Sequence, residues 1–406
     1  MLILNYQADY RSPLDQVDAE MLSVAGAREV ERFLSFRHGH RPTPLVPLDN
    51  LALELGIAAI HVKDEGHRLG LGSFKALGGS YAVIRLVLGE ASRQLRRPID
   101  ISELQTPPVR AIAQTMTVAC ATDGNHGRSV AQGAQLVGAQ CIVFVHAGVS
   151  EERIAAIGRF GAEIIRVRGS YDKSVAEASR IAEARGWITV SDTSWPGYER
   201  IPGFVMQGYT AILTEAMREL PQPPTHVFVQ SGVGGIAAAV AGQFAVLLGA
   251  KRPFFTVVDP SRAACLFASA RAGHVVKVPE GEPTVMAMLE CHEPSMMAWR
   301  ILSRAADAFM TVDDEEAVAA MKRLATPLSG DPPIVAGESG GVGLAGLMQV
   351  ASQSKLREQV ELGPDARVFL INTEGATDPK VYERLVGAAP SEVIARGERQ
   401  LEQVPR

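Results

Sequence analysis

The sequence is poor in the residues that build zinc sites or disulfide-stapled folds. Only four cysteines occur in 406 residues, and no two of them form a C-x-x-C pair. We therefore predict no metal-binding residues. Mostly free, buried thiols are typical of a cytoplasmic protein, although the spacing leaves open a bridge between Cys265 and Cys291.

Long runs of one charge and a basic, apolar leader are also missing. The net charge is −5 and both signs are interspersed, which predicts no nucleic-acid surface. The N-terminus lacks a basic segment followed by an apolar one, so we predict no signal peptide. The stretch 233–250 is apolar except for Gln243. Because a strand and a glycine turn precede it, we predict a buried helix there rather than a membrane span.

What the sequence does contain is a regular alternation of strands and helices. We predict strands at 57–63, 117–121, 141–146, 162–167, 187–191, 227–230, 254–258 and 368–371, and helices at 80–88, 126–137, 151–160, 171–185 and from 391. This alternation indicates an α/β protein with two open, mostly parallel sheets. Ligands of such sheets bind at the carboxyl ends of the strands.

A glycine turn follows the strand at 227–230. Gly232-Val-Gly-Gly-Ile-Ala237 matches the dinucleotide pattern G-x-G-x-x-A, and Asp259 stands where a ribose-binding acid is expected. Glycines at a helix N-terminus let backbone N–H groups approach any phosphate, however. The turn therefore predicts a phosphate site without naming the ligand, and a tight turn with no ligand is the structural alternative.

Two more turns carry polar residues in unusual settings. Lys75 lies within Gly72-Ser-Phe-Lys-Ala-Leu-Gly-Gly79. Burial lowers the pKa of a lysine, and a neutral amine is what condenses with an aldehyde; an exposed loop lysine is the alternative. Thr122-Asp-Gly-Asn-His-Gly127 offers an anion cradle, and Asn125 can donate to a phenolate oxygen, although the same residues could simply cap a helix.

Five segments, taken in order, resemble the fold-type II pyridoxal 5'-phosphate (PLP) enzymes. They are Pro42-Thr-Pro-Leu45, the lysine turn, the asparagine turn, Gly232-Val-Gly-Gly235 and Asn372-Thr-Glu-Gly375. That family includes the threonine and serine dehydratases and the tryptophan synthase β chain. The resemblance implies two α/β domains with PLP in the cleft between them, a large one from 1–85 with 205–406 and a small one from 86–204.

The resemblance also implies roles for the matching residues. Lys75 would bind PLP as a Schiff base and then take the α-proton, Asn125 would hold the ring hydroxyl, and Thr373 would face the ring nitrogen. A hydroxyl cannot protonate that nitrogen, which suits β-elimination. The further residues implied for the cofactor are Gly232, Val233, Gly234, Gly235 and Glu338, and those implied for the substrate carboxylate are Ser73, Thr122 and Gly124.

Asp123 narrows the resemblance, because most dehydratases carry a small residue there. It resembles the diaminopropionate ammonia-lyases together with the pieces 191–195, 197–199, 206–209, 284–287, Cys291, Glu293-Pro294 and 337–340. This implies elimination of 2,3-diaminopropionate to pyruvate and two ammonia. We expect both enantiomers to react, with Asp123 taking the α-proton of the D-form. Asp192 would contact the β-amino group; a turn cap is its structural alternative.

Other functions stay open at this level. Met288 and His292 stand where smaller residues are expected, so a serine, threonine or hydroxyaspartate dehydratase on the same fold is one alternative. An NAD-dependent dehydrogenase built on the 232–237 turn is another, but it leaves Lys75 and the asparagine turn unexplained. A third alternative is a binding protein that has kept the fold without catalytic activity, but the intact Lys75 argues against it. The resemblance further implies a homodimer acting on a small amino acid. The charge pattern and the reading of 233–250 as a buried helix predict no nucleic-acid or membrane partner.

Overall fold

In the computed structural model, which describes residues 1–122, 124–169 and 171–402, the chain forms two compact units. The larger unit comprises 1–23, 42–67 and 212–406, and the smaller comprises 24–41 and 68–211. The boundaries predicted from the sequence fall inside helices α4 (Lys75–Leu95) and α9 (Arg200–Gly208). The observed units differ from the predicted ones there, because each of these helices stays whole within the smaller unit.

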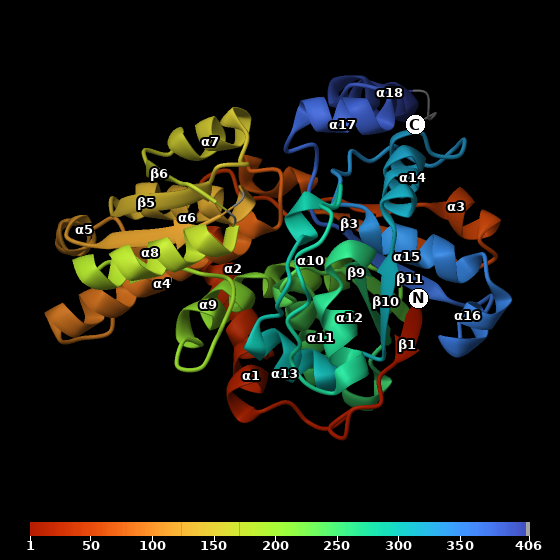
Figure 1. The fold of residues 1–406 in the computed structure, drawn as a ribbon, viewed down its shortest axis with the longest axis horizontal. Helices are drawn as coiled ribbons and strands as arrows, with labels where there is room; N and C mark the ends of the chain where they lie inside the picture. Colours follow the sequence, from red (N-terminus) through yellow and green to blue (C-terminus); the bar gives the residue numbers. More distant parts are fainter. Residues whose placement is uncertain (123, 170, 403–406) are drawn as a thin grey trace. The chain divides into compact units, whose positions relative to one another are not determined.

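The smaller unit is built on a four-stranded parallel sheet with the order β6-β5-β4-β7. The chain moves outward from β4 to β6 and then returns to the other side of β4. Right-handed crossovers therefore place α6 and α7 on one face and α8 on the other, and α8 crosses in front of the strands in Figure 1. The elements are β4 (Thr117–Ala121), α6 (Asn125–Val137), β5 (Gln140–His146), α7 (Glu151–Gly158), β6 (Glu163–Val167), α8 (Tyr171–Arg185) and β7 (Ile188–Thr189), with α2 (Val24–Ser35) and α5 (Pro107–Gln114) beside them.

Helix α4 begins earlier than the sequence suggests. The predicted glycine-rich turn running to Gly79, with a helix from about residue 80, is wrong, because α4 already begins at Lys75. A Cβ on Gly79 would lie 2.8 Å from Ser129 Oγ on α6, and a Cβ on Gly78 would lie 2.7 Å from the Val205 carbonyl oxygen on α9. These glycines are therefore there for close helix packing rather than for a turn.

The larger unit contains a seven-stranded sheet with the order β1-β10-β9-β8-β11-β3-β2. The five inner strands are parallel, and the two edge strands are antiparallel to their neighbours. The mostly parallel sheet is thus confirmed, and the short antiparallel edges are an addition. The strands are β1 (Leu2–Leu4), β2 (Leu45–Pro47), β3 (Ala59–Asp64), β8 (His226–Gln230), β9 (Phe254–Pro260), β10 (Ala308–Val312) and β11 (Arg367–Asn372).

Helices surround this sheet, and α11 (Gly235–Leu248) is the apolar helix predicted from the sequence. Its residues from Ile236 to Phe244 are buried, as a helix packed inside an α/β unit requires. Among the described residues no helix is both long and apolar enough to cross a membrane. The others are α1 (Gln16–Met21), α3 (Asp49–Glu54), α10 (Thr210–Glu219), α12 (Cys265–Ala272), α13 (Met296–Ala305), α14 (Asp314–Ala325), α15 (Val342–Ala351), α16 (Ser354–Gln359), α17 (Pro379–Val386) and α18 (Pro390–Glu402).

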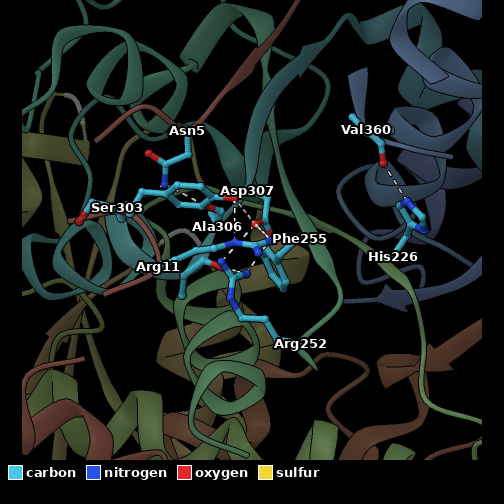
Figure 2. A network of polar contacts seen from close by, with 11 residues as sticks. Asn5, Arg11, His226, Arg252, Phe255, Ser303, Ala306, Asp307 and Val360 are labelled. Atoms are coloured by element: carbon cyan, nitrogen blue, oxygen red, sulfur yellow. Dashed lines mark hydrogen bonds and ion pairs between the residues drawn. The ribbon is translucent and has the colours of Figure 1, made fainter. Parts of the chain in front are cut away.

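A buried carboxylate ties the N-terminal segment to the larger sheet. Asp307, just before β10, pairs with Arg252 at 2.8 Å and with Arg11 at 3.1 Å, and it accepts the backbone N–H of Phe255 at 2.8 Å. Nearby, the Asn5 amide donates to the Ala306 carbonyl at 2.8 Å (Figure 2). Because the carboxylate is fully buried, these donors satisfy a charge that would otherwise be costly.

Candidate functional site

In the smaller unit, the predicted lysine meets the predicted aspartate. Lys75 is the first residue of α4, and its Nζ forms an ion pair with Oδ2 of Asp192, which follows β7. Both side chains are largely buried, with 21% and 13% of their surfaces exposed. Burial opposes ionisation of Asp192, but the charge of Lys75 and its hydrogen bond to the carboxylate outweigh it and hold the pKa of this carboxyl below its usual range.

The turn that carries Asp192 is held by its neighbours. The Ser191 hydroxyl accepts from the Thr193 backbone N–H at 3.1 Å, so Ser191 caps this turn and Asp192 is left to pair with Lys75. Tyr198 clamps the turn further, since its hydroxyl donates to the Thr189 carbonyl at 2.7 Å and accepts from the Ser191 N–H at 3.0 Å. The Ser191 hydroxyl thus caps this turn, while the Asp192 carboxylate contacts Lys75.

The asparagine turn lies at the start of α6 in the same unit. The Thr122 hydroxyl accepts from the backbone N–H groups of Gly124 and Gly127, at 3.0 and 3.1 Å, and fixes the turn. Asn125, the first residue of α6, is buried with 8% exposure. Asp123, the residue on which the predicted use of the D-enantiomer depends, lies outside the described residues.

The two turns of the smaller unit meet through a histidine. His126 on α6 places Nδ1 4.0 Å from Asp192 Oδ2, the same oxygen that contacts Lys75. Ser73 is buried beside the lysine, and its hydroxyl accepts the Lys75 backbone N–H at 3.3 Å. The smaller unit thus gathers an amine, a carboxylate and an imidazole within a buried region.

In the larger unit, the glycine turn links β8 to α11. Gly234 has a φ of +102°, a conformation that favours glycine, and it immediately precedes the helix. A Cβ on Gly232 would lie 3.0 Å from the Cys291 sulfur and 3.3 Å from the Leu289 Cα. Only glycine leaves this cradle open, and the backbone N–H groups at the start of α11 suit an anion such as a phosphate.

A buried glutamine connects this turn to β11. Gln230, the last residue of β8, is fully buried, and its Nε2 donates to Thr373 Oγ1 at 2.9 Å and to the Ile371 carbonyl at 3.0 Å. Its Oε1 accepts from the Gly343 N–H at 3.1 Å. The chain order reverses between β8 and β11, which is where open parallel sheets bind ligands. Gly232, Gly234 and Thr373 therefore follow the two strands at this switch point.

Glu338 lies buried in a loop beside Thr373. The Thr373 hydroxyl lies 3.3 Å from the neighbouring Ser339 carbonyl, and the Thr373 N–H donates to the Gly340 carbonyl at 3.2 Å. The Ser339 hydroxyl accepts from the Met288 N–H at 3.1 Å. Met288 is thus attached by its backbone to the loop next to Thr373, which keeps it a candidate for shaping the pocket.

Asp259 turns out to be a structural residue. Its Oδ2 accepts from the Phe267 backbone N–H at 2.8 Å on α12, and burial raises its pKa to about 8. A ribose-binding acid would instead present a charged, accessible carboxylate. The four cysteines are free thiols, so Cys265 and Cys291 are not bridged. Among the described residues, no group of histidine, cysteine or acidic side chains could hold a metal ion.

The donor set fits pyridoxal phosphate. The larger unit supplies a glycine cradle that a single Cβ would fill, and a threonine hydroxyl held at the end of β11. The smaller unit supplies a largely buried lysine amine, paired with Asp192. The glycine cradle can bind a phosphate, the threonine hydroxyl can donate to a pyridine nitrogen, and the lysine amine can condense with an aldehyde.

Comparison with known proteins shows the class. The family described as pyridoxal-phosphate dependent enzyme matches residues 36–374. The chain therefore belongs to the pyridoxal-phosphate dependent enzymes, which confirms the predicted family, cofactor and fold class. The NAD-dependent dehydrogenase that the glycine turn left open is wrong.

Individual relatives are more specific. Diaminopropionate ammonia-lyase of Escherichia coli strain K12 is 39% identical over 373 residues, which cover 90% of this chain and 92% of that protein. A crystal structure of the Escherichia coli enzyme in complex with an aminoacrylate-PLP azomethine reaction intermediate matches with a TM-score of 0.85 and 36% identity, over 95% of this chain and 96% of the other. The complex of that enzyme with D-serine matches equally well.

Reasoning from the sequence missed two residues of this region. His126 and Gln230 were read only as parts of a helix and a strand. A polar side chain ending an otherwise apolar strand, as Gln230 does in His-Val-Phe-Val-Gln, is the signal that could have drawn attention to it. For His126 the partner, Asp192, lies 66 positions away in the chain, and nothing local indicates the contact.

Proposed function

We propose that this chain uses PLP to eliminate 2,3-diaminopropionate to pyruvate and two ammonia. The observation that carries the proposal is the buried ion pair of Lys75 with Asp192, which sets beside the reactive amine a carboxylate able to pair with a second substrate nitrogen. The 39% identity to diaminopropionate ammonia-lyase supports the same substrate. A hydroxy amino acid has no β-ammonium group to pair with this carboxylate.

Residues of both units bind the cofactor in this proposal. PLP, when bound, supplies an aldehyde carbon that condenses with amines and a ring that withdraws electrons from the substrate α-carbon. Lys75 holds the cofactor and, once released by the substrate amine, removes the α-proton. The Gly232–Gly235 backbone holds the phosphate, Asn125 the ring hydroxyl and Thr373 the ring nitrogen, with Glu338 near the ring.

The substrate is held and cleaved by the remaining residues. Ser73, Thr122 and Gly124 bind the α-carboxylate, and Asp192 pairs with the β-ammonium group, which leaves as ammonia when the bond between nitrogen and the β-carbon breaks. The released enamine then takes up water to give pyruvate and the second ammonia. Asp123 removes the α-proton of the D-enantiomer from the face opposite Lys75.

The test is the stoichiometry of the products. Ammonia and pyruvate are measured after incubation of the PLP-loaded enzyme with D- and L-2,3-diaminopropionate, with serine, threonine and hydroxyaspartate run in parallel. Two ammonia per pyruvate, with little turnover of the hydroxy amino acids, is the expected result. Faster turnover of a hydroxy amino acid would instead make the chain a dehydratase whose pocket Met288 and His292 have reshaped.

We further propose that the enzyme works as a homodimer in the cytoplasm. The family resemblance supports the dimer, and the four free thiols suit a reducing compartment. Light scattering after size-exclusion chromatography of the loaded enzyme should give twice the 43.4 kDa chain mass.

A further inference from the structure

His126 is held in one orientation by a backbone carbonyl. Its ring is 6% exposed, and Nε2 lies 2.9 Å from the carbonyl oxygen of Val190, the residue after β7. A carbonyl oxygen only accepts hydrogen bonds, so Nε2 must carry the proton of the neutral ring. The other ring nitrogen, Nδ1, is therefore an unprotonated lone pair whenever His126 is neutral.

That lone pair faces a carboxylate. Nδ1 is buried, has no hydrogen-bond partner within the described part of the chain, and lies 4.0 Å from Asp192 Oδ2. A lone pair opposite a carboxylate oxygen is unfavourable unless a proton lies between them. On its other side, the same Oδ2 is paired with the Lys75 amine.

Three other ionisable groups near Asp192 do not change their charge near neutral pH. Burial raises the pKa of Cys120, of Tyr198 and of Tyr209 well above their usual values, so all three stay neutral. Within the described residues, Lys75 and His126 are then the groups whose charges act on this carboxylate.

We propose that His126 is the terminal proton acceptor of a relay that runs from Lys75 through Asp192. The Lys75 ammonium passes a proton to Asp192 Oδ2, and the neutral carboxyl so formed then passes a proton to His126 Nδ1. The result is a neutral amine, an unchanged carboxylate and an imidazolium, so charge and protons balance. The relay rests on the proposed function, because it prepares the amine on which that function depends, and it makes His126 a positioning residue that acts through Asp192.

The charges that act on His126 change as the proton moves. Burial lowers the pKa of His126, the Asp192 charge raises it and the Lys75 charge lowers it. When Lys75 gives up its proton, its lowering effect ends and that of Asp192 remains, so the imidazolium becomes easier to form. The carboxylate keeps a cationic partner throughout, on one side or the other, which avoids an unpaired buried charge.

The experiment measures PLP uptake by the cofactor-free full-length chain as a function of pH, followed by the absorption band that borohydride fixes on Lys75. Glutamine can place an amide nitrogen where Nε2 lies and keep the bond to Val190, but it cannot accept a proton. We expect the His126→Gln curve to move to higher pH by about one unit, which makes uptake roughly tenfold slower at pH 7.

His226 provides a matched control. It is a buried histidine whose Nε2 also lies 2.9 Å from a backbone carbonyl, that of Val360 (Figure 2), while its Nδ1 contacts the Thr225 hydroxyl. His226→Gln should leave the pH dependence of uptake at the wild-type position. A His126→Gln curve that superimposes on the wild-type curve overturns the relay, because a purely structural histidine would be replaced without effect.

A second variant covers the case in which His126→Gln fails to fold. His126→Asn puts an amide N–H near the Nδ1 position and should show the same alkaline displacement; a wild-type curve for it also overturns the proposal. Because PLP uptake uses no substrate, the relay can be judged even if 2,3-diaminopropionate proves to be the wrong substrate. Conversely, loss of the relay would leave the product stoichiometry of the wild type unchanged.

Discussion

The Gln230 amide donates a hydrogen bond to the Thr373 hydroxyl across the switch point between β8 and β11. Gln230→Met removes this bond together with those to Ile371 and Gly343. Each buried group left unsatisfied costs about 1–3 kcal/mol, so we expect the Tm of the cofactor-free protein to fall by several degrees. Gln243→Met is the control, because within the described part of the chain the side chain of this equally buried glutamine bonds to Thr214 alone; an equal loss in both variants would contradict the network.

Close packing of α4 makes a second prediction. In Gly78→Ala the new Cβ would lie 2.7 Å from the Val205 carbonyl oxygen, and such overpacking costs about 1–3 kcal/mol. Gly89→Ala lies in the same helix, with Arg200 Nη2 at 3.5 Å as its nearest neighbour, and should gain about 0.5–1 kcal/mol. Thermal unfolding of the two variants should therefore shift in opposite directions, and parallel shifts would refute the packing argument.

Asp259 should make stability fall with rising pH. Burial raises its pKa to about 8, so between its unfolded value near 4 and pH 8 the folded state binds a proton that the unfolded state lacks. The free energy of unfolding then decreases by up to about 1.4 kcal/mol per pH unit in that window. Asp259→Asn should flatten the dependence of Tm on pH between 5 and 8. A variant with the wild-type slope would show that the carboxyl titrates normally.

The two enantiomers should respond differently to loss of Asp123. If Asp123 takes the α-proton of the D-form, Asp123→Asn should lower kcat/KM for D-2,3-diaminopropionate by about 10²–10⁴-fold and spare the L-form, for which Lys75 is the base. Rates for each enantiomer, measured on enzyme with matched PLP content, decide this. Equal losses on both would remove the assignment.

The fold and the site residues differ in how far sequence predicts them. The β4–α6–β5 pattern is set by local apolar periodicity and by Gly124 and Gly127, so its strands were predicted closely. The edge strands β1 and β2 have three residues each, too few to show a period. The helical state of Gly78 depends on its neighbour Val205, which no local pattern contains.

Contacts between distant residues explain the remaining gaps. The sequence indicates Lys75 through its turn, and it indicates Asp192 and Thr373 through the family resemblance, but it does not indicate their partners. Gln230 acquires its role from Thr373, more than a hundred positions later, and His126 acquires its role from Asp192. A hydrogen bond of this kind is invisible until the strands that carry its two ends are placed side by side.

The strand order of the larger sheet also affects how the protein folds during its synthesis on the ribosome. Strand β11, residues 367–372, lies between β3 and β8, so that sheet cannot close until nearly the whole chain has emerged. The smaller unit is complete by residue 211 and can fold while synthesis continues. The nascent chain therefore exposes the apolar flanks of β3 and β8 throughout the synthesis of about 140 residues, which makes this interval the one in which chaperone binding matters most.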